Sequence, residues 1–200
     1  MKQGFVKVAS ATPRIRVADP VYNAQVICEQ AKEAAEHGAK IVVFPELCIT
    51  GYTCNDLFLQ ELLLEKAKEA LLTIAEETGQ LETLFLVGLP VDKDGRLYNV
   101  AAVLYRGRIL GMIPKKNIPM YAEFYEGRHF TPGEETVTEY RLGKQVIPFG
   151  SNLLFRCEEL PELILGCELC EDLWVAEPPS TSHALMGLAK LVPSLFTFWV

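Results

Sequence analysis

Length, composition and charge set the first limits on the function of this chain. It has 200 residues, half of them hydrophobic, which suits one domain that buries a core without disulfides or metals. Its 19 Lys and Arg residues are outnumbered by 26 Asp and Glu residues, and the net charge is −7. A phosphate-binding surface needs the opposite balance, so we expect no nucleic-acid partner.

The chain carries no evident signal for secretion or for membrane insertion. Residues 1–10 alternate apolar and polar types and lack a continuous apolar run, so they predict a first strand and a cytoplasmic protein. The only membrane candidate, residues 185–200, is short and contains Pro193. The six cysteines lie in apolar stretches, which predicts free thiols in a reducing compartment.

Two amphipathic helices are expected in the first part of the chain. Asp19-Pro20 predicts a capped helix start, and apolar or small residues then recur at helical spacing until Gly38. Residues 56–78 predict a second helix with one apolar side. Between them, residues 39–44 predict a short buried strand that Pro45 ends.

The middle of the chain predicts a run of strands joined by hairpins. Residues 84–89 form the first of these strands, and the turn signals Asp94-Gly95 and Arg106-Gly107 separate two more, over 97–105 and 108–113.

The remaining segments predict a structured loop and more short strands. Residues 117–136 are rich in aromatic, charged and turn-forming types, which is typical of a functional loop with one helical turn. Residues 145–149 and 152–157 are expected to form a pair of short strands, and 163–168 another strand. No internal repeat or linker divides the chain.

Three reactive side chains follow predicted strands. Glu46 comes after the strand that Pro45 ends, Lys115 after the strand that Pro114 ends, and Cys170 after the last strand. Strand ends meet at one edge of a sheet, so these residues can converge there. A free thiol is mostly protonated at neutral pH and needs a base and a nearby cation. The set therefore suits acyl transfer through a thioester, with the carboxylate as base and the ammonium stabilising each oxyanion.

Each of these residues also has a purely structural explanation. A glutamate after a strand is usually solvated, Lys116 carries the same charge as Lys115, and Cys170 can be a small buried hydrophobe. Histidine is the usual partner of a reactive cysteine, but none of the three in the chain follows a predicted strand.

Three segments taken in order resemble the nitrilase, or carbon–nitrogen hydrolase, superfamily. They are VVFPELCITGY (residues 42–52), PKKNIPMYAEFYEGRHF (114–130) and CELCEDLWVAEPPS (167–180). In that family, the Glu, Lys and Cys of such segments form the catalytic triad. The resemblance therefore implies that Glu46 is the general base, Lys115 the oxyanion stabiliser and Cys170 the nucleophile. The Lys-x-x-Ile-Pro pattern selects Lys115 over Lys116.

Within the superfamily, the strings YAEFYE and CEDLW look most like the glutaminase domain of glutamine-dependent NAD synthetases. That resemblance implies glutamine as the substrate, with Tyr121, Phe124 and Glu171 in contact with it and Glu171 facing its α-amino group. Glu123 matches a second glutamate that often lines the family's site, where it would position substrate or tune Lys115.

The resemblance also implies a fold and a set of partners. The expected fold is an α/β four-layer α-β-β-α sandwich. It forms a single domain over residues 1–200 that is incomplete at its C-terminus. Residues 186–200 are an atypical tail, and our hypothesis is a truncated or frame-shifted product. The amidase step needs no cofactor. ATP and deamido-NAD belong to a synthetase domain that the chain lacks, and a homo-oligomer is expected.

Three other interpretations stay open. Another amidase of the same superfamily would act on a different small amide. Cys167 and Cys170 form a Cys-x-x-Cys pair, which is a pattern of metal and redox sites, although no second pair accompanies it. The chain can also be a non-catalytic remnant whose uncovered sheet favours association.

Overall fold

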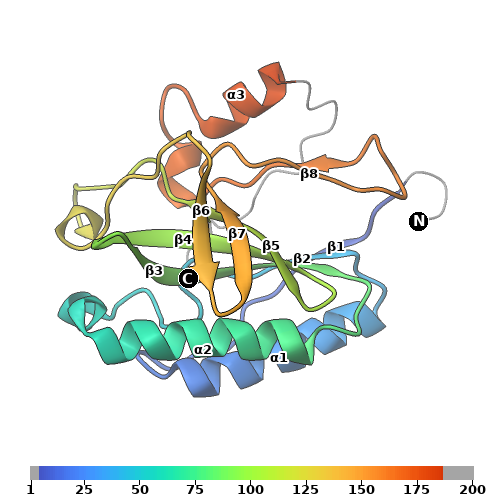
Figure 1. Cartoon of the computed structure of the whole chain (residues 1–200), viewed down its shortest axis with the longest axis horizontal. Helices are drawn as coiled ribbons and strands as arrows, with labels where there is room; N and C mark the ends of the chain where they lie inside the picture. The colour runs from blue at the N-terminus through green and yellow to red at the C-terminus, as the bar shows by residue number, and fades with distance from the viewer. Residues whose placement is uncertain (1–4, 187–200) are drawn as a thin grey trace.

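Two long helices cover one face of a seven-stranded sheet in the computed structural model, which describes residues 5–186 (Figure 1). The helices are α1 (Pro20–Glu36) and α2 (Glu61–Glu77). A two-stranded sheet and the short helix α3 (Pro179–Leu185) lie on the opposite side. The layers thus follow the helix, sheet, sheet, helix order that the family resemblance implies.

The large sheet is mixed and has the strand order β1-β2-β3-β4-β5-β7-β6. Its strands are β1 (Val8–Ser10), β2 (Ile41–Val43), β3 (Leu84–Lys93), β4 (Arg96–Tyr105), β5 (Arg108–Pro114), β6 (Thr138–Leu142) and β7 (Gln145–Phe149). Neighbours β1, β2 and β3 run parallel, whereas β3, β4 and β5 form antiparallel hairpins. Strands β2 and β4 therefore lie on either side of β3, and β5 lies next to β4.

Helix α1 begins and ends where its sequence signals place it. The side chain of Asp19 accepts a hydrogen bond from the backbone N–H of Tyr22 at 3.1 Å, and Pro20 occupies the first helical position. Beyond the C-terminal end, Gly38 adopts a φ of 83°, which side chains other than glycine rarely adopt.

The start of the second helix differs from the prediction. Residues Asn55–Leu59 form the 3₁₀ helix η1, and Gln60 is extended, with φ −89° and ψ 121°. A continuous α-helix from residue 56 is therefore wrong, and α2 begins at Glu61. The apolar spacing that suggested one helix included Leu59 and Leu62, but both are exposed, whereas η1 buries Phe58 and α2 buries Leu63.

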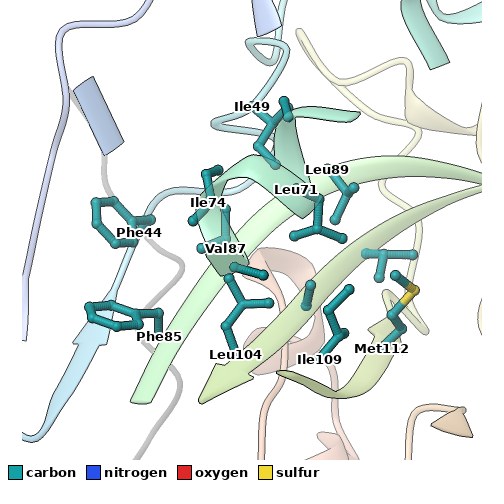
Figure 2. Packing of buried hydrophobic residues seen from close by; sticks show 14 of the residues in the cluster. Phe44, Ile49, Leu71, Ile74, Phe85, Val87, Leu89, Leu104, Ile109 and Met112 are labelled. Atoms are coloured by element: carbon teal, nitrogen blue, oxygen red, sulfur yellow. The ribbon is translucent and has the colours of Figure 1, made fainter. Parts of the chain in front are cut away.

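The main core lies between these helices and the sheet. Figure 2 shows how Leu71 and Ile74 of α2 meet Val87 and Leu104 of the sheet, and all four are at most 1% exposed. Burial of a Leu or Ile side chain contributes roughly 1.5–3 kcal/mol. This face therefore fixes the position of β3 and β4, on which the candidate site depends.

A smaller core lies on the other face of the large sheet. There the sheet packs against strands β8 (Phe155–Arg156) and β9 (Ile164–Leu165) and the segment that follows β9. A Cβ on Gly111 of β5 would come within 2.9 Å of the Phe155 ring, so glycine allows the close approach of the two layers. This packing brings the chain around Cys170 to the edge of the large sheet.

Several strand predictions are confirmed and one pairing is wrong. Residues 145–149 form β7 as expected, but β7 pairs with β6, which the sequence reading missed, and β8 pairs with β9. Loop 117–136 contains one helical turn, η2 (Glu126–Arg128). Most of the tail expected over 186–200 lies outside the described residues. Within the described part of the chain, no helix is long and apolar enough to cross a membrane.

Candidate active site

Glu46 lies in a tight loop that follows β2. Leu47, the next residue, has a φ of 52°, and the loop folds down onto β3 at Gly88. A Cβ at Gly88 would lie 2.4 Å from the backbone nitrogen of Leu47, so any other residue there would push the loop away. The glycine thereby lets the Glu46 carboxylate enter the space above the sheet.

Lys115 follows β5 directly and remains attached to the sheet. Its backbone N–H donates to the carbonyl of Asn99 at 2.8 Å, and its carbonyl accepts from Gly133 at 2.7 Å. The Lys115 side chain is 0% exposed. A fully buried ammonium needs anionic partners, so its surroundings define the site.

Cys170 opens the 3₁₀ helix η3 (Cys170–Leu173) and has a φ of 43°. A left-handed backbone is uncommon in residues other than glycine, and such strain gathers at functional sites. Cys170 is half-buried, whereas Cys167 is 2% exposed within the second core. The two thiols therefore sit in different surroundings.

Two carboxylates meet the ammonium of Lys115. Its Nζ lies 2.8 Å from Oε1 of Glu46 and 2.6 Å from Oε1 of Glu126. The hydroxyl of Tyr52 donates to the same Glu126 oxygen at 2.7 Å, and the Asn99 amide donates to Glu46 at 2.6 Å. One cation is thus shared by two buried carboxylates, each held by a further neutral donor.

The electrostatics of the cluster follow from burial and from these charges. Burial raises the pKa of Glu46 above its ordinary value, although Lys115 opposes that shift. Burial works against the charge of Lys115, but Glu46 and Glu126 outweigh it and raise the pKa of Lys115. The ammonium therefore stays charged across the physiological range.

The Cys170 thiol faces this cluster. Burial raises its pKa to about 12, and Glu46 adds to the shift through its charge and as a hydrogen-bond acceptor, while Lys115 lowers it. The resting sulfur is therefore a thiol beside a carboxylate that can take its proton. An ammonium, a base and a nucleophile close together can perform covalent acyl transfer.

Asp172 ties the nucleophile segment to the lysine segment. Its carboxylate is 1% exposed and accepts hydrogen bonds from the backbone N–H groups of Leu169 (3.0 Å), Asn117 (2.7 Å) and Lys116 (3.4 Å) and from the Asn117 side chain (2.9 Å). One side chain thus fixes the residues that flank Cys170 against those that follow Lys115.

The residues expected to contact the substrate lie around this cluster. The Tyr121 hydroxyl donates to Oε2 of Glu171 at 2.7 Å, and the Tyr121 and Phe124 rings meet edge to face with centroids 5.7 Å apart. The structure brings these three together beside Cys170. Glu123 is exposed and lines a small cavity of about 120 Å³ next to Glu126.

Four residues of the site were missed by sequence reasoning: Tyr52, Asn99, Glu126 and Asp172. The sequence offered Glu123 as a residue that positions substrate or tunes Lys115, whereas the carboxylate in contact with the ammonium is that of Glu126. Both glutamates lie in the string YAEFYE. The sequence offered one signal, the helical spacing of four residues between Glu126 and the aromatic Phe130. Only the fold reveals which of the two carboxylates is buried.

The other candidate sites contribute less. The six cysteines are free thiols, and the described residues hold no group of three or more His, Cys, Asp and Glu side chains that could bind a metal ion. His183 is buried in α3, with Nε2 3.3 Å from the carbonyl of Ser151, so it has a structural partner away from the Lys115 cluster.

Comparison with known proteins identifies the family. The carbon-nitrogen hydrolase family model matches residues 7–192. The chain therefore belongs to the carbon–nitrogen hydrolase family, and it is homologous to the glutaminase part of glutamine-dependent NAD synthetases.

The relatives include curated proteins and solved structures. The glutamine-dependent NAD(+) synthetase of Mycobacterium tuberculosis is 40% identical over 190 residues, which cover 95% of this chain and 28% of that protein. The Xylella fastidiosa enzyme of the same name is 34% identical, with 94% and 31% covered. The chain thus spans less than a third of these relatives.

Solved structures confirm the fold. The glutamine-dependent NAD(+) synthetase of Cytophaga hutchinsonii superposes with a TM-score of 0.76 at 29% identity, covering 83% of this chain and 28% of that one. An amidase from Nesterenkonia sp. superposes with a TM-score of 0.66 at 22% identity, covering 94% and 64%.

Proposed function

We propose that the chain hydrolyses the side-chain amide of glutamine to glutamate and ammonia, with Cys170 as nucleophile, Glu46 as general base and Lys115 as oxyanion stabiliser. The observation that carries the proposal is the fully buried Lys115 ammonium, 2.8 Å from the Glu46 carboxylate and facing the Cys170 thiol. A structural ion pair has no need of a half-buried thiol on a strained backbone beside it.

The first half of the reaction forms a thioester. Glu46 takes the proton of the Cys170 thiol as the sulfur attacks the amide carbon, and Lys115 stabilises the negative charge that develops on the amide oxygen. When this intermediate collapses, the carbon–nitrogen bond breaks and the nitrogen takes the proton from Glu46. Ammonia leaves, and the acyl group stays on the sulfur.

The second half uses the same groups on water. Glu46 removes a proton from a water molecule, and the hydroxide attacks the thioester carbon while Lys115 again stabilises the oxyanion. The carbon–sulfur bond then breaks, and the sulfur takes the proton back from Glu46. Glutamate leaves, and the thiol is restored.

Substrate choice is assigned to the residues at the mouth of the site. Glu171 carries a negative charge suited to an α-amino group, and the Tyr121 hydroxyl bound to it fixes its orientation. Phe124 packs on Tyr121 and would contact the aliphatic part of glutamine. Glu123 lines the neighbouring cavity and would meet a polar part of the substrate.

The ammonia would serve NAD synthesis in the full-length protein. Relatives named glutamine-dependent NAD(+) synthetase are more than three times as long as the matched region, so we assign the use of ATP and deamido-NAD to a synthetase domain outside this chain. Self-association of the glutaminase part belongs to the same proposal.

The test is intact-mass spectrometry of the 200-residue chain after exposure to a diazoketone analogue of glutamine. The thiol displaces dinitrogen, so a single adduct on Cys170 that free glutamine suppresses and that is lost in Cys170→Ala supports the proposal. An adduct that small aliphatic amides suppress and glutamine does not would identify a different amidase. No adduct on a chain that is folded by circular dichroism would indicate a non-catalytic remnant.

A further inference from the structure

Asn99 is a fully buried amide at the centre of the site that the proposed chemistry does not use. It lies on β4 and is 0% exposed. Its Nδ2 donates to Oε1 of Glu46 at 2.6 Å and lies 3.4 Å from Oε2 of Glu126. Its backbone carbonyl accepts the N–H of Lys115 at 2.8 Å. One residue thus contacts both carboxylates and the lysine backbone.

The orientation of this amide is set by charge. If the amide were flipped, its carbonyl oxygen would face carboxylate oxygens of Glu46 and Glu126, and no hydrogen bond could form. The observed orientation leaves Oδ1 of Asn99 buried without a hydrogen-bond partner among the described residues. Leaving a buried acceptor unpaired costs free energy, so the contact with the carboxylates outweighs that cost.

The hydrogen bonds to Glu46 divide the roles of its two oxygens. Asn99, on β4, and Lys115, directly after β5, both donate a hydrogen bond to Oε1 of Glu46. A carboxylate that is held at one oxygen from two directions cannot rotate freely. The other oxygen, Oε2, then keeps a fixed direction for the proton that the base must accept.

We propose that Asn99 is a positioning residue for the hydrolysis, because its amide holds Glu46 ionised and oriented to take the proton of the Cys170 thiol. This inference rests on the proposed function of Glu46 as the base. Lys115 alone cannot keep Glu46 ionised and oriented, since its single charge is shared with Glu126. A neutral donor favours the ionised form of Glu46 without adding a second cation that would compete for the oxyanion.

The groups that face Glu46 set the direction of the expected effect. They are the ammonium of Lys115, the carboxylate of Glu126, the thiol of Cys170, the hydroxyl of Tyr52 and the amide of Asn99, all within the cluster described above. Loss of the Asn99 donor removes an interaction that lowers the pKa of Glu46. The base would then be ionised only at higher pH.

The test is the pH dependence of Cys170 alkylation by iodoacetamide, which displaces iodide and does not involve glutamine. Peptide mass spectrometry reads Cys170 separately from the other cysteines. In Asn99→Leu we expect the rate at neutral pH to fall about tenfold, the scale of one lost charge-assisted hydrogen bond, and the acid limb to move to higher pH. Asn99→Ala removes the same donor without bulk and replaces Asn99→Leu if that variant does not fold.

Asn23 offers a matched control. It is also a 0% exposed asparagine, but its side chain bonds Arg16 and the carbonyl of Ile49. Asn23→Leu should lower stability and leave the position of the acid limb unchanged. An acid limb at the same pH in the Asn99 variant and the wild type would overturn the inference. Because alkylation needs no substrate, a shifted limb would support the role of Asn99 even if glutamine failed to bind.

Discussion

Glu126 and Glu123 form a natural pair for testing which carboxylate supports the lysine. Glu126 is 4% exposed and lies 2.6 Å from the Lys115 ammonium, with the Tyr52 hydroxyl on the same oxygen. Glu123 is exposed three residues earlier in the same loop. We expect Glu126→Gln to lower kcat strongly and to leave KM nearly unchanged, because Glu126 orients the oxyanion stabiliser and not the substrate.

The magnitude follows from the contact that is removed. Glu126→Gln keeps the shape of the side chain and replaces a charged acceptor by a neutral one. Hydrogen bonds to charged groups contribute about 1.5–3 kcal/mol. At about 1.4 kcal/mol for each factor of ten, this predicts a fall in kcat of roughly 10- to 150-fold. Glu123→Gln should change kcat by less than about threefold, since exposed charges interact weakly.

The assay is steady-state release of ammonia from glutamine, with circular dichroism and thermal unfolding as checks on the fold. Equal losses of kcat in both variants would refute the assignment of Glu126 as the partner of Lys115. A loss of kcat confined to Glu123→Gln would favour the tuning of Lys115, which is one of the two roles that the sequence offered for Glu123. A rise in KM for Glu123→Gln alone fits its place at the cavity next to Glu126.

Three further predictions concern the pH profile, the loop anchor and the core. Because burial raises the pKa of Glu46 above 4.5, the acid limb of kcat/KM should lie above pH 4.5, and a limb at or below that value would contradict Glu46 as the base. Asp172→Asn places an amide donor against backbone N–H groups, so kcat and Tm should both fall, with a stability loss of about 1–3 kcal/mol in urea unfolding. Leu71→Ala should cost about 2–5 kcal/mol in the same measurement and leave KM unchanged, because Leu71 is 0% exposed and lies on the helix side of the sheet.

Much of the fold could be predicted because its signals are local. The Asp19 cap, the helix stop at Gly38 and the hairpin turns each act within a few residues, and the structure has them where the sequence predicts. The failures involve short strands with weak patterns, even though the partners are close in sequence: β6 pairs with β7 across a two-residue turn, and β8 pairs with β9 after seven residues. Strand β6 is short and half exposed, with only two buried residues, and β8 has two residues in all, so periodicity could not assign their partners.

The candidate site divides in the same way. Glu46, Lys115 and Cys170 stand next to strand or loop boundaries, and the structure brings all three together. Glu126 and Asn99 could not be distinguished from the sequence, because their roles depend on burial. An asparagine inside an apolar strand only interrupts the hydrophobic pattern as far as the sequence shows. The structure shows that the neighbours of Asn99 are two carboxylates.

Strand β4 therefore links the fold to the chemistry. It pairs with β3 over nine residues, from Phe85↔Leu104 to Lys93↔Arg96, and this register places Asn99 opposite Pro90. A shift of one residue would turn the Asn99 side chain to the other face of the sheet and bring an apolar neighbour beneath Glu46. The long hairpin and the core on α2 hold that register. The packing that stabilises the sheet thus also keeps a hydrogen-bond donor under the proposed base.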